Sequence, residues 1–243
     1  MSGKAVEIML KQTTSQLLPP GSRLTPMLKQ WVHAKQQAQD AVLLFRMGDF
    51  YEMFAQDAQK AAPILELALT TRDKNTKNPI SMAGFPYHAA QSYIAKLLQQ
   101  GLKVAVCDQL EDPASAKGIV QRGVTRIVTP GTTMQEETLP PKNTNYLVGI
   151  SHHAGEFGLA ALDWSTGQFV VSASSREQVL LEELDRLSPA EILVDKSCQQ
   201  LASLQKNLQE SNARRLRRCR VEERALTQSA HELLESLGEI PKQ

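Results

Sequence analysis

The stretch AVLLFRMGDFYEMF, residues 41–54, decides how the first half of this chain folds. Residues 41–47 form an apolar run of the length of a buried strand, and residues 50–54 alternate in polarity as a second strand does. Gly48 and Asp49, which lie between the two runs, favour a tight turn. The sequence therefore predicts two strands joined by this turn.

The flanking segments predict helices and further strands in the same domain. Thr25 followed by Pro26 is typical of a helix start, and this helix should end near Asp40. A second helix is expected over 57–66, where Pro63 demands a kink or an early end. A third is expected over 88–100, closed by Gly101. Strands are expected at 67–71, 80–84, 103–108 and 124–129.

The second half of the chain predicts another layered domain. Three strands are expected at 146–153, 156–164 and 168–174, the last two joined by a turn that ends in Gly167. They are followed by a helix over 175–187 with a capping box of Ser175 and Gln178, a strand over 191–195, a helix over 198–210, a strand over 216–221 and a helix over 228–237. This order is typical of an α/β (α+β) fold with mixed sheets and is similar to a ribonuclease-H-like core.

Composition sets the domain organisation and the broad class. The 243 residues are 42% hydrophobic and 22% charged, with a net charge of +1, which is ordinary for a folded protein of one large or two small domains. We expect a flexible tail over 1–22, a first domain over 23–129, a linker over 130–145 and a second domain over 146–243. No membrane span, secretory leader or disulfide framework is apparent, so we expect a cytoplasmic protein.

Charge is divided unevenly between the two halves. Residues 1–130 carry 15 basic and 10 acidic side chains, whereas residues 131–243 carry 12 and 16. A basic half joined to an acidic half indicates that only the first meets a polyanion. Five arginines between Arg214 and Arg220 form a local cluster, which fits either a solvated strand or turn, or a surface that engages a partner.

Enzymatic signatures are missing from the sequence. It contains no phosphate-binding P-loop, no HExxH or GxSxG motif and no CxxC pair. His152 and His153 are adjacent on an expected strand, so their side chains point to opposite faces and cannot share a metal ion. A nuclease of ribonuclease-H-like fold needs clustered carboxylates, and Asp163 and Asp195 alone do not make such a cluster. We therefore expect no catalytic residue, no metal site and no enzyme activity.

Phe50 and Glu52 are the residues that composition does not explain. On a strand they are two apart, so they project from the same face, while Tyr51 and Met53 face the core. Periodicity alone leaves two interpretations open. The pair belongs to a half-buried strand with a solvated carboxylate, or the ring is a wedge that enters between base steps and the carboxylate a hydrogen-bonding sensor.

Six motifs, taken in order, carry a resemblance to a known family. They are RMGDFYEMF (46–54), LTTR (69–72), PISMAGFPYHA (79–89), VAVCDQLEDP (104–113), the KG…RIVTPGT segment (117–132) and the LD…F segment (162–169). In these motifs the chain resembles the MutS family of bacterial DNA mismatch repair proteins. The resemblance implies a mismatch-recognition domain followed by a connector domain of ribonuclease-H-like fold. It also implies that Phe50 stacks on a mispaired base from the minor groove and that Glu52 hydrogen-bonds that base.

The resemblance sets the expected partners and cofactors. Mismatched duplex DNA is the expected ligand. The candidate phosphate contacts are Lys74, Lys77, Lys117, Arg122 and Arg126. Each of them could equally be a solvated surface charge. The connector domain would bind MutL, and a second MutS subunit would bind through domains beyond this chain. ATP and magnesium belong to the complete family protein, whose clamp, lever and ATPase domains we expect after residue 243, together with the last connector helix. We also expect the bacterial nucleoid as its location. The alternative is a protein-interaction adaptor that no longer binds DNA.

Overall fold

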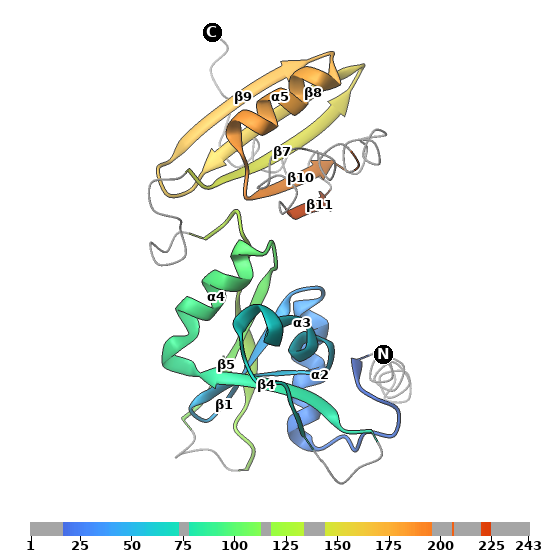
Figure 1. Ribbon diagram of the computed structural model, residues 1–243, viewed down its shortest axis with the longest axis vertical. Coiled ribbons are helices and arrows are strands. Elements are labelled where there is room, and N and C mark those ends of the chain that lie inside the picture. Colours follow the sequence, from blue (N-terminus) through green and yellow to red (C-terminus); the bar gives the residue numbers. More distant parts are fainter. Residues whose placement is uncertain are drawn as a thin grey trace. The chain divides into compact units, whose positions relative to one another are not determined.

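The computed structural model describes residues 17–72, 78–112, 118–133, 144–195, 206 and 220–224. The chain divides into two compact units, Met1–Val128 (unit 1) and Thr129–Gln243 (unit 2) (Figure 1). Each unit is described below by itself. None of the helices in the described residues is both long and apolar enough to cross a membrane.

Unit 1 is built on a six-stranded mixed sheet. The predicted pair at its centre is confirmed, because β1 (Val42–Met47) and β2 (Phe50–Phe54) pair antiparallel across the Gly48-Asp49 turn. Gly48 has a φ of 58°, which glycine adopts without steric cost. In sheet order the strands are β3 (Thr70–Arg72), β4 (Ile80–Pro86), β2, β1, β5 (Val104–Gln109) and β6 (Arg122–Val128), with only β1 and β5 parallel.

Helices cover both faces of this sheet and enclose two apolar cores. Helix α2 (Pro26–Ala38) begins as predicted, with the Thr25 hydroxyl accepting a hydrogen bond from the Leu28 amide at 3.3 Å. It packs with the inner side chains of β1 and β5 around Trp31 and Phe45. The opposite face is covered by α3 (Ala55–Leu65) and α4 (Ala90–Gln99), the latter preceded by a 3₁₀ turn over Tyr87–Ala89 (Figure 1).

Three local expectations for unit 1 are corrected. The strand expected at 67–71 is Thr70–Arg72, because Glu66 is left-handed and the Leu67 amide bonds back to the Ala62 carbonyl, which closes α3. Pro63 does not break α3: it lies in the last turn, and the helix ends two residues later at Leu65. The tail expected over 1–22 is packed from residue 17 onward: Leu18 is buried in the α2 core.

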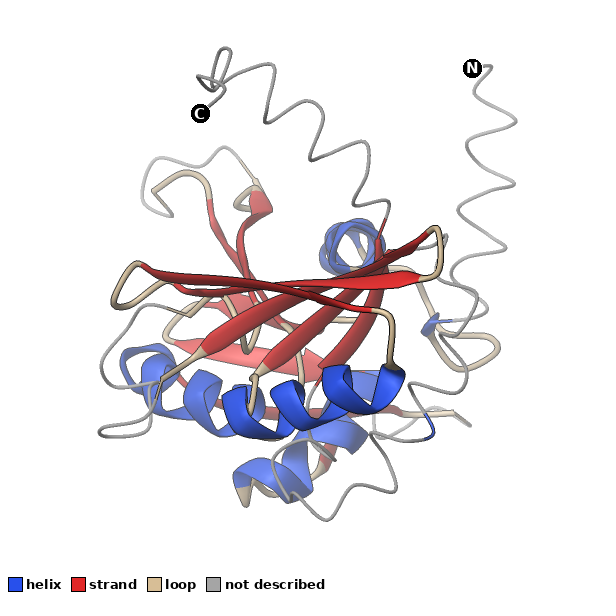
Figure 2. Cartoon of the chain, turned by 90° about the horizontal axis from the view of Figure 1, so that it is seen from above, coloured by secondary structure: helices blue, strands red, loops and turns tan. Residues whose placement is uncertain are grey.

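Unit 2 is a five-stranded sheet with a helix along one face. The three predicted strands are present as β7 (Tyr146–His153), β8 (Glu156–Asp163) and β9 (Gln168–Ser174), which pair antiparallel in that order. The predicted hairpin joins β8 to β9, and Gly167 has the positive φ that its turn requires. Strands β10 (Glu191–Asp195) and β11 (Arg220–Arg224) add parallel on the β7 side. Helix α5 (Glu177–Leu187) buries Leu180, Leu184 and Leu187 against the sheet (Figures 1 and 2). Both units therefore have the predicted mixture of helices and mixed sheets.

Unit 2 also departs from the predicted elements. Helix α5 begins at Glu177 without a side-chain cap, because the Ser174 hydroxyl accepts the Arg176 amide at 3.1 Å and keeps the chain turned there. Of the strand expected at 216–221, residues 220 and 221 belong to β11, which continues to Arg224, and residues 216–219 lie outside the described part of the chain. The helices predicted at 198–210 and 228–237 lie outside the described residues, apart from Lys206, and the arginine cluster lies outside them up to residue 219.

The ends of the segment predicted as a linker are packed into unit 2. Pro130 and Gly131 are buried, and the Gly131 amide donates to Glu191 Oε2 at 3.0 Å. The Asn145 side-chain amide donates to the Pro130 carbonyl at 2.9 Å. Residues 134–143 of the segment lie outside the described part of the chain. The predicted bounds of the linker, 130–145, therefore include residues at both ends that belong to unit 2.

Candidate nucleic-acid interface

Phe50 is an exposed aromatic side chain at the first position of β2. It directly follows the Gly48-Asp49 turn and pairs with Met47 on β1 and Pro86 on β4. Its side chain remains 47% exposed, whereas the neighbouring Tyr51 and Met53 are buried on the other face of the sheet. The alternation predicted for this strand is confirmed, and it leaves an aromatic ring at the end of the sheet in contact with solvent.

Glu52 lies on the same face as Phe50, one pleat further into the sheet, and is half-buried. Its cross-strand neighbours are Phe45 on β1 and Gly84 on β4. A side chain at position 84 would place its Cβ 2.9 Å from the Tyr51 carbonyl and 3.4 Å from Glu52 Cγ. Gly84 thus leaves the space in which the stem of Glu52 lies.

The Glu52 carboxylate is poised to accept a hydrogen bond from outside the protein. Its Oε2 atom is buried and has no hydrogen-bond partner among the described residues. Burial raises the pKa of Glu52 above its ordinary value of 4.5, and the positive charge of Arg72 on β3 partly opposes that shift. A buried polar atom without a partner lowers stability, so binding of a ligand that donates a hydrogen bond to this oxygen is favourable.

The candidate phosphate contacts differ in their surroundings. Arg126 is exposed on β6, the edge strand of the sheet. Arg122 is engaged inside unit 1: its Nε donates to the Arg46 carbonyl at 2.6 Å and its Nη1 to the Val120 carbonyl at 2.8 Å. Burial lowers the pKa of Arg122. Arg122 therefore has a structural role, bonding to backbone carbonyls of unit 1, that could not be inferred from its charge alone. Lys74, Lys77 and Lys117 lie outside the described residues.

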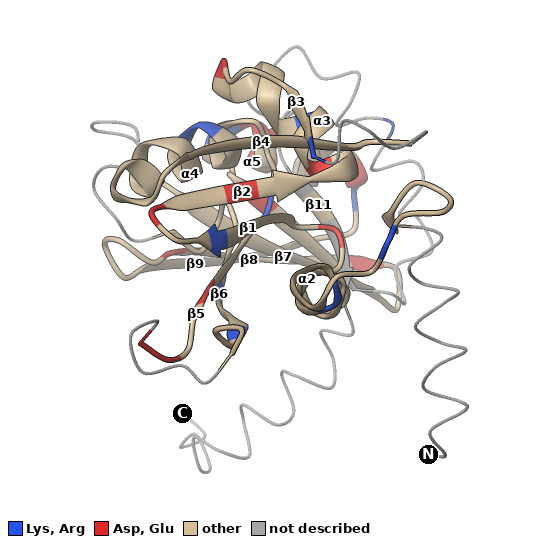
Figure 3. Cartoon of the chain, turned by 90° about the horizontal axis from the view of Figure 1, so that it is seen from below, with Lys and Arg blue, Asp and Glu red and all other residues tan. Residues whose placement is uncertain are grey.

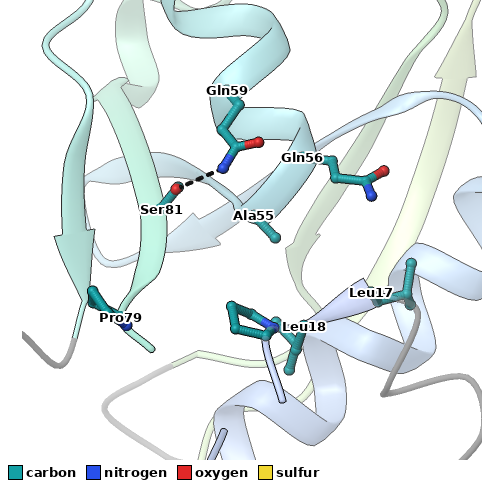
Figure 4. A pocket seen from close by; sticks show the side chains of 8 residues that line it. Leu17, Leu18, Ala55, Gln56, Gln59, Pro79 and Ser81 are labelled. Atoms are coloured by element: carbon teal, nitrogen blue, oxygen red, sulfur yellow. Dashed lines mark hydrogen bonds between the residues drawn. The ribbon is translucent and has the colours of Figure 1, made fainter. Parts of the chain in front are cut away.

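Other candidate sites in the described part of the chain offer less chemistry. No group of His, Cys, Asp and Glu side chains in that part is arranged to hold a metal ion. Asp163 caps the turn after β8, accepting hydrogen bonds from the Ser165 amide and hydroxyl. A hollow of about 290 Å³ beside α3 has no charged lining residue (Figure 4); its lining is Leu17, Leu18, Pro19, Ala55, Gln56, Gln59, Pro79 and Ser81. The strand end around Phe50 is the better candidate.

Comparison with known proteins identifies the family. The model of MutS domain I matches residues 25–137, and the model of MutS domain II matches residues 145–239. The chain belongs to the MutS family. Curated relatives named DNA mismatch repair protein MutS are 50% identical over 173 residues in Desulfosudis oleivorans and 51% identical over 175 residues in Syntrophobacter fumaroxidans. Each alignment covers 71% of this chain and 20% of the relative, so the chain spans about a fifth of the length of these MutS proteins.

The match to MutS domain I contains the whole strand-end site, with Phe50, Glu52, Arg72 and Gly84. Sequence reasoning found the first two from their spacing and missed the other two as parts of the site. The motifs LTTR and PISMAGFPYHA contain Arg72 and Gly84. The pairing of Gly84 with Glu52 and the electrostatic effect of Arg72 on Glu52 depend, however, on the register of β2 with β4 and of β4 with β3. No local pattern specifies that register.

Proposed function

We propose that unit 1 recognises mismatched or unpaired bases in duplex DNA, with Phe50 as a wedge and Glu52 as a sensor in the minor groove. The observation that supports this proposal is that one strand presents an exposed ring and a carboxylate oxygen without a partner on the same face. A ring inserted at a base step unstacks it at a cost of a few kcal/mol. That cost is lower where pairing is already defective, so the wedge converts weak pairing into preferential binding.

Glu52 adds selectivity by repelling ordinary duplex. A carboxylate near phosphates is unfavourable unless it gains a specific hydrogen bond. The Watson–Crick edge of an unpaired base can supply such a bond, whereas in a regular pair that edge is occupied by the partner base. The exposed Arg126, together with Lys74, Lys77 and Lys117, would then supply affinity that is independent of sequence. The charged residues of β1 and β2 are Arg46 and Glu52, and most of the length of these two strands is uncharged (Figure 3).

A second candidate function, protein docking by unit 2, is favoured by the apolar surface of β9. Phe169 and Val171 are two residues apart on this edge strand and are 63% and 65% exposed. Exposed apolar side chains of this kind are typical of interaction sites. From the family resemblance we propose MutL as the partner of unit 2, and a second MutS subunit as a partner of the complete protein. We assign no cofactor to the two units, and ATP and magnesium only to the complete protein.

The test compares matched and mismatched duplexes of one sequence over a range of salt concentrations. Phe50→Ala should remove the mismatch preference while the thermal midpoint changes little, because the ring is half exposed. Glu52→Ala should leave matched binding equal or tighter and lower the preference by about ten- to a hundredfold, as expected for about 1.5–3 kcal/mol from a hydrogen bond to a charged group.

Arg126→Ala is the matched control in this comparison. It should weaken binding to both duplexes about equally and reduce the salt dependence, because a phosphate contact carries no sequence information. If Glu52→Ala and Arg126→Ala act alike on the two duplexes, Glu52 is not a sensor. If wild-type protein shows no salt-dependent DNA binding, the docking function is the better assignment.

A further inference from the structure

The face of the sheet behind Phe50 carries a cluster of polar and aromatic groups that the mismatch-reading mechanism does not use. Arg46 is the cross-strand partner of Tyr51, so both project from the face opposite to Phe50 and Glu52. The guanidinium carbon of Arg46 lies 3.6 Å from the centre of the Tyr87 ring and 5.6 Å from that of Tyr51. At the shorter distance the planar guanidinium stacks on the ring, where cation–π attraction holds it.

Arg46 and its neighbours hold the turn that presents Phe50. The Nε of Arg46 donates to the Gly48 carbonyl. The Tyr87 amide donates to the Asp49 carbonyl at 2.9 Å, and Arg122 Nε donates to the Arg46 carbonyl. Every one of these donors is supplied by unit 1 itself, so the turn is fixed before any ligand arrives.

A second set of bonds ties the same strand end across the sheet. The Tyr51 hydroxyl donates to Asp108 Oδ1 on β5, and the Thr125 hydroxyl on β6 donates to Asp108 Oδ2 at 3.1 Å. Burial, followed by the bond to Asp108, raises the pKa of Tyr51 to about 12, so the hydroxyl stays a donor at neutral pH. The strand end is therefore tied to β1, β4, β5 and β6.

We propose that Arg46 and Tyr87 are positioning residues that hold the Gly48-Asp49 turn, and with it the Phe50 ring, in the orientation needed for insertion. The inference rests on the proposed function. A ring on a loose turn must be ordered when it enters the duplex, and ordering one side chain reduces affinity by about two- to tenfold. Matched duplex, into which the ring does not insert, avoids this loss. The stacked pair thus acts on mismatch preference without touching DNA.

The rival role for Arg46 is direct contact with a phosphate, because a guanidinium has further donors beyond its Nε. The two roles differ in what they predict. A phosphate contact strengthens matched and mismatched binding alike and contributes to the salt dependence. A positioning residue changes only their ratio.

Three variants of the full chain separate these roles. Tyr87→Leu removes the aromatic face, Arg46→Lys keeps the charge but loses the planar stack, and Tyr87→Phe keeps the ring as the matched control. Tyr87 is partly exposed, which favours folding of all its variants, and a thermal midpoint close to wild type checks this for each. Hydrogen exchange of the 46–50 peptide is measured in the free protein, and binding to both duplexes is measured over a range of salt concentrations, with Phe50→Ala in parallel.

We expect Tyr87→Leu and Arg46→Lys to speed exchange in the turn and to lower the mismatch preference about two- to tenfold, with matched affinity unchanged and Tyr87→Phe like wild type. Unchanged exchange in both variants overturns the inference, as does an equal loss on both duplexes. If Phe50→Ala abolishes the preference but neither variant lowers it, the inference alone fails. If Phe50→Ala has no effect, or no duplex binds, the proposed function fails and the exchange result still decides whether Arg46 and Tyr87 hold the turn.

Discussion

At the scale of single residues, Glu52 is placed where an ionised carboxylate is unfavourable. Half-buried and opposite Gly84, it has an oxygen without a partner among the described residues, and Arg72 compensates only part of the loss of hydration. Residues that lower stability in this way are frequently functional. The stability that the free protein loses at Glu52 would be recovered when the carboxylate accepts the hydrogen bond proposed from a base.

The raised pKa of Glu52 predicts a pH-dependent effect of Glu52→Gln on stability. Above the native pKa, the wild-type carboxylate is charged in a poorly solvated place, so the neutral variant should unfold at higher temperature. As the pH falls toward the ordinary value of 4.5, the native carboxyl binds its proton first and the advantage of the variant should vanish. Thermal unfolding of both proteins between pH 4.5 and 8 measures the difference. An advantage that grows on acidification would mean that Arg72 stabilises the charged form.

Gly84 is predicted to tolerate no side chain. In Gly84→Ala the new Cβ would lie 2.9 Å from the backbone carbonyl of Tyr51, which cannot move without disturbing the sheet. Overpacking of this kind costs about 1–3 kcal/mol. Gly123→Ala is the control, because its Cβ meets only the exposed Leu110 side chain at 3.1 Å, and that side chain can move. Urea unfolding of both variants gives the comparison, and equal losses would contradict the argument.

At the scale of elements, the sequence predicted what depends on local patterns. The alternation of FYEMF set the faces of β2, and the Thr25-Pro26 pair set the start of α2. The end of α3 at Glu66 and the late start of β3 were missed, because they depend on a left-handed residue that no glycine marks. The neighbours of Glu52 were missed for another reason. They are set by pairing between β2 and β4, some thirty residues apart, and pairing over that distance has no local signature.

A buried ion pair links two of these elements, and removing one of its partners should destabilise unit 1 strongly. Lys35 on α2 donates to Asp57 on α3 at 2.9 Å and to the Ala41 carbonyl at 2.6 Å, while the Leu43 amide donates to the other Asp57 oxygen. In Asp57→Ala the ammonium of Lys35 is left buried without its counter-ion. Removing one partner of a buried pair costs about 3–5 kcal/mol.

The loss is measured by urea unfolding followed through the fluorescence of Trp31, which is buried in unit 1, in a Trp164→Phe background. Gln56→Ala, an exposed position on the same helix turn, is the control and should change stability by less than about 0.5 kcal/mol. The double variant Lys35→Met with Asp57→Leu should lose less than Asp57→Ala, because it leaves no charge unpaired. A double variant as unstable as the single one would show that the pair itself is stabilising.

At the scale of the whole molecule, the boundary between the two units follows directly on the end of a strand. Strand β6 of unit 1 ends at Val128, and the next residues already pack on unit 2, where Pro130 and Gly131 are buried. The Glu191 carboxylate, buried at the start of β10, accepts the Gly131 amide. Gly131 therefore belongs energetically to unit 2, although its sequence context of turn-forming residues resembles a linker.

This assignment predicts that Gly131→Ala destabilises unit 2 and leaves unit 1 unchanged. The added Cβ would lie 2.8 Å from Glu191 Cβ and 3.0 Å from Leu147 Cδ1, so the segment must shift and strain its bond to Glu191. We expect a loss of about 1–3 kcal/mol, as for other overpacked sites. Hydrogen exchange in increasing urea, read separately from peptides of β1 and β8, gives the stability of each unit. Glu156→Ala, exposed on β8, is the control and should alter neither. An equal loss in both units would show that the two unfold as one, and that the segment after Val128 supports unit 1 as much as unit 2.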